Sequence, residues 1–328
     1  MSRLLHPILL AVVALALVAA NAAQAQSPRA KAKQPTPPAP EAPVAPVIDA
    51  AYAAFQRGEY LTAFTEATKR VEEAKDPAAM TLLGELYVNG LGVKIDPARA
   101  AEWYRLAIAR DNREAMFALG VMHLQGKGVA QDRKEAARLF AAASDRGHAS
   151  AAYNLAVLYI EGEAFPQDYA TAARLFRVAA ERDLTDGQHA LALLYKDGRG
   201  VDKNPIEAAH WLGRAAQLGH VAAKVEFAIA LFNGDGIQKD EARAAALFRQ
   251  AALHGDPVAQ NRLARILAAG RGVAKDPIEA GAWHILARGN SVPDPWLDQL
   301  LNELPEAERA AAEKRAQAWR EGHPAPRT

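Results

Sequence analysis

Three short motifs in this sequence place a basic residue between two glycines, as phosphate-binding loops often do. The basic residues are Lys127, Arg199 and Arg271. A nucleotide-binding loop of the P-loop type needs the longer pattern G-x-x-x-x-G-K-[S/T] after a strand. That pattern does not occur, and the glycines fall between two predicted helices. We therefore do not expect nucleotide binding.

Histidine, serine and cysteine form no catalytic or metal-binding pattern. His148 and His220 fall at predicted turns, where an exposed histidine is ordinary, and His210 and His284 fall on predicted helices. The sequence contains no H-E-x-x-H motif, no histidine pair at i, i+4 and no G-x-S-x-G elbow. Cysteine is absent, which removes thiolate nucleophiles, disulfides and cysteine zinc sites. We predict no catalytic residue, no cofactor and no metal, and expect a protein that is not an enzyme.

The charges are almost balanced. Lys and Arg total 39 and Asp and Glu total 38, so the formal net charge is +1. Proteins that bind nucleic acid usually carry a basic face, and no basic stripe is visible here. A nucleic-acid partner is therefore not expected. Half of the residues are apolar, which is enough for a sizeable core.

The N-terminal residues read as an export signal followed by a spacer. An apolar run from Pro7 to Ala20 is too short to span a bilayer, and small residues end it at Ala25. We predict a signal peptide over 1–25, cleaved between Ala25 and Gln26, and a Pro-rich linker over 26–47. The mature protein would be periplasmic or secreted, without a transmembrane segment after cleavage. An uncleaved anchor is the alternative.

Glycines recur along the chain at a constant interval of 36 residues. The first glycine of each pair is Gly90, Gly126, Gly162, Gly198, Gly234 or Gly270. The second follows two residues later at Gly92, Gly128, Gly200, Gly236 and Gly272, and Ala164 replaces it in the third unit. Alanines beginning at Ala100 and Ala107 keep the same interval. A constant period of this length indicates a repeat architecture.

Each unit is predicted to form two helices. Ala79, Leu83 and Tyr87 fall at i, i+4 and i+8, which gives a first helix one apolar face. Gly90 suits the left-handed end of that helix, and Asp96 with the proline after it suits the start of a second. One such pair cannot bury both of its faces, so the units must stack. The predicted fold is all-α, a right-handed α-solenoid of stacked antiparallel helix pairs.

The unit pattern LG.LY..G.GV..D...A..WY..AA..G resembles the Sel-1-like repeat family, which is related to tetratricopeptide repeats. The resemblance covers six repeats over 76–290. A preceding helix pair over 48–75 resembles a tetratricopeptide unit, and 291–328 resembles a helical cap with a short tail. Trp296, Leu297, Leu300 and Leu301 would cover the last repeat. Because both ends are capped, we expect a monomer.

Residues that differ between units, yet stay apolar or aromatic, are the candidates for recognition. They form a stripe on the first helices, opposite the face used within each unit. The candidate groove residues are Phe117, Val121, Tyr153, Val157, His189, Leu193, Ile229, Phe232, Asn261 and Arg265. The alternative is that these residues pack against the neighbouring unit's helices.

The resemblance implies a function in assembling protein complexes. We therefore expect a non-enzymatic periplasmic scaffold that binds a peptide or an envelope protein, of unknown identity, in a concave groove. The alternative is an envelope enzyme or glycan-binding factor related to peptidoglycan or β-lactams. Disulfide-rich members of the family have been linked to β-lactam binding, but their paired cysteines are missing here.

Overall fold

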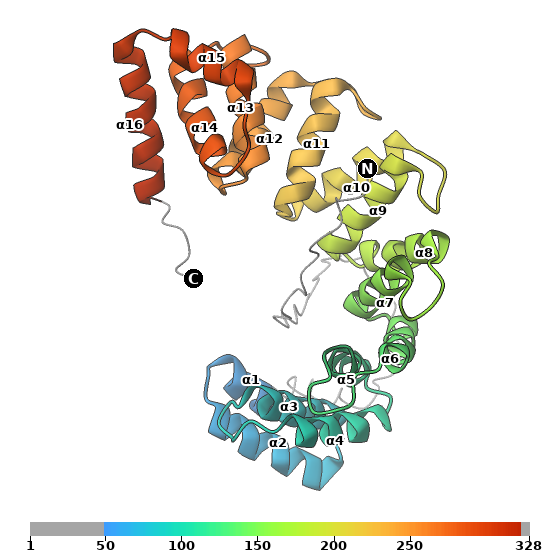
Figure 1. Cartoon of the computed structure of the whole chain (residues 1–328). Coiled ribbons are helices and arrows are strands. Elements are labelled where there is room, and N and C mark those ends of the chain that lie inside the picture. Colours follow the sequence, from blue (N-terminus) through green and yellow to red (C-terminus); the bar gives the residue numbers. More distant parts are fainter. Residues whose placement is uncertain (1–48, 323–328) are drawn as a thin grey trace, which may run out of the picture. The chain divides into compact units, whose positions relative to one another are not determined.

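The computed structural model describes residues 49–322, where the chain forms helices joined by turns and no strand (Figure 1). The predicted signal peptide and Pro-rich linker lie outside the described residues. Among the described helices, none has both the length and the apolar character that crossing a bilayer requires.

The sixteen helices within residues 49–322 occur in pairs. The N-terminal pair is α1 (Ala50–Gln56) and α2 (Tyr60–Ala74). The first helices of the six repeats are α3 (Pro77–Asn89), α5 (Arg113–Gln125), α7 (Ala149–Glu161), α9 (Thr185–Asp197), α11 (Val221–Asn233) and α13 (Pro257–Ala269). The second helices are α4 (Pro97–Ile108), α6 (Arg133–Asp145), α8 (Tyr169–Ala180), α10 (Pro205–Gln217), α12 (Glu241–Leu253) and α14 (Pro277–Gly289). The last two helices are α15 (Pro295–Glu303) and α16 (Glu306–Gly322).

Each helix from α1 to α14 packs against the next one along the chain, and α16 returns to pack on α14 (Figure 1). The two alanine series lie at these contacts, where all twelve members are at most 4 % exposed. They are Ala100, Ala136, Ala172, Ala208, Ala244, Ala280, Ala107, Ala143, Ala179, Ala215, Ala251 and Ala287. Small side chains let the helix backbones approach, and large ones such as Phe140 and Phe248 fill the space beside them. The predicted α-solenoid is confirmed.

The loop inside each repeat is built as the glycine pattern predicts. The first helix of every repeat ends at a glycine in the left-handed conformation, such as Gly90 with φ +67°. An Asp or Asn side chain then caps the second helix, as Asp96 does by accepting from the amide of Arg99. The amide of Asp96 also donates to the carbonyl of Tyr87 at 2.9 Å, which closes the loop onto the first helix. The same bond recurs in all six repeats.

The second glycine of each pair serves the contact between repeats. A Cβ at Gly236 would lie 2.0 Å from the carbonyl oxygen of Pro205, at the start of the preceding repeat's second helix. Equivalent backbone contacts occur at the other four second glycines. In the third repeat, which has Ala164 at this place, Arg133 at the start of α6 instead pairs with Glu161 and Glu163.

Candidate binding pocket

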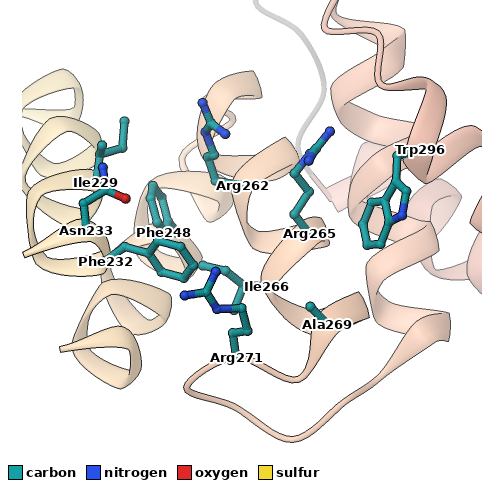
Figure 2. Close-up of a pocket in the computed structure, with 10 residues that line it drawn as sticks. All are labelled: Ile229, Phe232, Asn233, Phe248, Arg262, Arg265, Ile266, Ala269, Arg271 and Trp296. Atoms are coloured by element: carbon teal, nitrogen blue, oxygen red, sulfur yellow. The ribbon is translucent and has the colours of Figure 1, made fainter. Parts of the chain in front are cut away.

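A pocket of about 370 Å³ lies near the C-terminal end of the array, between the first helices of the last two repeats (Figure 2). Helix α11 contributes Ile229, Phe232 and Asn233, and α12 contributes Phe248. The rest of the lining comes from α13, the loop after it and the start of α15, with Arg262, Arg265, Ile266, Ala269, Arg271 and Trp296. This volume is at the lower end of the range for small-molecule sites and suits one or two side chains.

Two arginines that line the pocket lie close to two of its aromatic rings. The guanidinium of Arg271 lies over the Phe232 ring at 4.2 Å, and that of Arg265 lies 5.4 Å from the Trp296 ring (Figure 2). Cations near aromatic faces are attracted by the ring quadrupole. Arg271 is also paired with Glu241, which further restricts its side chain. The walls of the pocket therefore combine apolar surface with positive charge.

Asp294 holds Arg265 and connects the pocket to the cap. This carboxylate is 3 % exposed, and it accepts from Arg265 Nε at 2.5 Å and Nη2 at 2.8 Å. It also accepts from the Asn261 amide at 2.8 Å and from the Leu297 backbone amide as N-cap of α15. Burial alone would raise the pKa of Asp294, but these hydrogen bonds outweigh it and lower the pKa to about 2. The network fixes the start of α15 and thereby places Trp296.

Three of the ten predicted groove residues, Ile229, Phe232 and Arg265, line this pocket. Asn261 does not, because it is 8 % exposed and its amide is bonded to Asp294. The groove interpretation of Phe117 is wrong. Phe117 is 3 % exposed and its ring stacks on His148 at a centroid distance of 4.4 Å, so it is part of the packing between repeats.

The four remaining aliphatic and aromatic candidates are half-buried between repeats. Val121, Val157 and Tyr153 pack against the hydrophobic core, and Tyr153 lies 5.3 Å from Phe176. Burial raises the pKa of Tyr153 to about 12. Leu193 is also half-buried and does not line the pocket. Most of the predicted groove residues thus pack between repeats, as the alternative stated. A pocket forms where the C-terminal end of the stripe meets the cap.

Sequence reasoning missed three functional candidates: Arg262, Arg271 and Trp296. Trp296 was expected to cover the last repeat, but it is 45 % exposed at the pocket rim, while Leu297 and Leu301 are buried. The sequence did contain a signal for Arg262. The equivalent position of the preceding repeat, 36 residues earlier, is Glu226, so the charge at this position is reversed between the two repeats. No sequence signal placed Trp296 beside Arg265.

The expectation that His148 and His220 are ordinary exposed residues is wrong. Each one caps the following helix, where its Nδ1 accepts from a backbone amide, as His220 does from Ala223 at 3.0 Å. The Nε2 of each faces a carboxylate on the first helix of the repeat that the histidine ends. These are Glu114 on α5 at 2.9 Å from His148 and Asp186 on α9 at 3.2 Å from His220. Only 9 % and 18 % of the two side chains are exposed. These histidines are structural links within the stack.

His189 lies beside His220, and we expect it to make this junction sensitive to acid. Its ring centroid lies 4.6 Å from that of His220, and burial followed by the charge of His220 lowers its pKa from 6.5 to about 4. Asp186 and Glu226 oppose this shift, and Lys196 adds to it. The unfolded chain therefore binds more protons than the folded chain between these values. Stability contributed by neutral His189 should be lost as the pH falls from about 6.5 to about 4.

The measurement is the melting temperature at a series of pH values for the native chain and for His189→Tyr, which introduces the residue that the preceding repeat has at Tyr153. The variant should lose less stability across this pH window than the native chain. Equal losses would show that His189 does not contribute to the acid response.

Comparison with known families and structures gives a consistent result. The family described as Sel1 repeat matches residues 77–112, 113–148, 149–184, 185–220, 223–256 and 257–288. The crystal structure of a Sel1 repeat protein from Oxalobacter formigenes is 28 % identical, with a TM-score of 0.61, and the match covers 73 % of this chain and 96 % of that one. A protective antigen of uropathogenic Escherichia coli strains that displays the SLR fold is 26 % identical, with a TM-score of 0.51 and coverage of 83 % and 68 %. Comparison with curated proteins gave no match.

Proposed function

This chain belongs to the Sel1 repeat family, and from this premise we propose that it is a non-enzymatic periplasmic adaptor that binds a peptide segment of another envelope protein. The Sel1-repeat scaffold is typical of protein-interaction adaptors. The segment would enter the pocket between α11, α13 and α15. The periplasmic location rests on the N-terminal export pattern.

The observation that carries the proposal is the composition of the pocket. Interfaces between proteins concentrate their binding energy in aromatic residues and arginine near a desolvated centre. Phe232, Trp296 and three arginines line this pocket, and Trp296 is among the more exposed large apolar residues of the described chain. The repeat pattern does not require an Arg at position 265, since Ile229 stands 36 residues before it, and Trp296 lies beyond the last repeat.

The test is retention of proteins from an envelope extract on the immobilised full chain. We expect a protein to be retained by the native chain and by Leu106→Ala, but not by Trp296→Ala. Leu106 on α4 is a matched control, because it is 46 % exposed and Trp296 is 45 % exposed. Circular dichroism should show that both variants are folded. Equal retention by all three chains would contradict binding at the pocket, and retention of cell-wall glycan alone would contradict a protein partner.

A further inference from the structure

The pocket lining carries positive charge and no carboxylate of its own. It contains three arginines and no Asp or Glu. Within residues 49–322, the side chain of Arg262 makes no hydrogen bond or ion pair, while Arg265 and Arg271 each have a carboxylate partner behind the lining. Asp235, close in sequence to the lining residue Asn233, accepts a hydrogen bond from the Asn233 side chain. The pocket therefore has one guanidinium with all of its donors available.

The two paired arginines are also able to bind a further group. A guanidinium has five N–H donors. Arg265 uses Nε and Nη2 for Asp294, and Arg271 uses the same two atoms for Glu241. The Nη1 group of each has no partner among the described residues. Because carboxylates and aromatic rings already restrict both side chains, a ligand would order them at little further entropic cost.

Figure 2 shows arginine side chains between apolar ones around the pocket. Arg262 and Arg265 project from successive turns of α13, and the Trp296 ring lies on the far side of Arg265. On the opposite side, the Phe232 ring lies beside Arg271 and Ile266. A ligand that matches this arrangement carries negative charge next to an apolar side chain.

Resting on the proposed function, we infer that the partner segment is an acidic peptide in which Asp or Glu neighbours an aromatic or aliphatic residue. The apolar side chain enters the cavity of about 370 Å³ against Phe232 and Ile266. A carboxylate beside it pairs with Arg262 and with the free Nη1 group of Arg265. Bidentate pairing of guanidinium with carboxylate supplies both charge and geometry. Arg262 then determines which segments bind.

The test is a selection of random peptides displayed on phage against the immobilised full chain, followed by affinity measurements on synthetic copies of the selected peptides. The same selection is run on Arg262→Glu and on Arg110→Glu. Arg110 is an exposed arginine just after α4, so its replacement makes the same change in net charge away from the pocket. Both positions are exposed, and circular dichroism should show that both variants are folded.

We expect the native chain and Arg110→Glu to select peptides with Asp or Glu beside an apolar residue. Arg262→Glu should bind those peptides about tenfold more weakly and should select peptides with Lys or Arg instead. Changing the peptide's Asp to Asn should weaken binding to the native chain by a similar factor.

Two other outcomes are distinguishable. In the first, the selected peptides are neutral or basic, and their binding is lost with Trp296→Ala but unchanged with Arg262→Glu. This result would overturn the acidic specificity and leave the proposed function standing. In the second, the selected peptides bind both Trp296→Ala and Arg262→Glu as well as they bind the native chain, or no peptide is selected. This result would overturn the acidic specificity together with peptide binding at the pocket.

Discussion

Replacing Gly236 by Ala should destabilise the protein by about 2–5 kcal/mol, although only one methyl group is added. Gly236 has φ +69°, which costs a residue with a Cβ about 1–2 kcal/mol. The new Cβ would also lie 2.0 Å from the carbonyl oxygen of Pro205 and 2.2 Å from its carbonyl carbon. Those atoms are backbone and cannot rotate away, so the fourth and fifth repeats must separate. Overpacking of this kind costs about 1–3 kcal/mol more.

The control for this prediction is Gly219→Ala, in the turn just before α11. Gly219 has φ +93° but no atom within 4 Å of an added Cβ, so only the backbone strain of about 1–2 kcal/mol applies. Urea unfolding gives the loss of stability, and amide hydrogen exchange shows whether α10 and α11 lose protection first. Equal effects of the two substitutions would show that contact with Pro205 is unimportant.

Replacing Asp294 by Ala should cost about 3 kcal/mol or more. The change removes the N-cap of α15, which is usually worth about 1 kcal/mol, and an ion pair of which only the carboxylate is buried. It also leaves the buried Asn261 amide without its acceptor, which costs about 1–3 kcal/mol. Arg265 loses both of its bonds to Asp294 but remains half exposed to water, which limits the total. Peptide binding should weaken as well, because α15 carries Trp296.

The matched control is Asp240→Ala, which removes an exposed N-cap from α12 and should cost about 1 kcal/mol. Urea unfolding of both variants, and of Asp294→Asn, measures the difference. The folded-state pKa of Asp294 is lowered from 3.8 to about 2, so its contribution is complete above about pH 4 and is lost as the pH falls toward 2. The native chain should therefore lose its advantage over Asp294→Asn in this acid range. A loss no greater than that of Asp240→Ala would contradict the network.

Local requirements made the repeat visible in the sequence. Gly90 and its five equivalents all end helices in the left-handed conformation, and the Asp or Asn after each of them caps the next helix. These positions depend on backbone geometry within a few residues, which each unit must satisfy in the same way. The two alanine series that begin at Ala100 and Ala107 were predictable for a similar reason, because every unit uses them for the same close contact between helices.

The candidate site was less predictable, because it depends on the contact between the last two repeats and on the position of α15 in the C-terminal cap. The stripe of variable residues was found, but its period could not show that Phe117 is covered by His148 while Phe232 stays open to a pocket. The two glycines on either side of Arg271 predicted a turn. They did not show that the arginine between them lies against Phe232.

By itself, the sequence determined the all-α repeat fold, its period, the helix ends and the family of this protein, since these follow from residues close together in one unit. Only the tertiary structure decided where an opening remains. Asp294 and Arg265 are 29 residues apart, and their pairing places Trp296 beside α13. Contacts of that kind join a repeat to a cap that has no copy elsewhere in the chain, so periodicity carries no information about them.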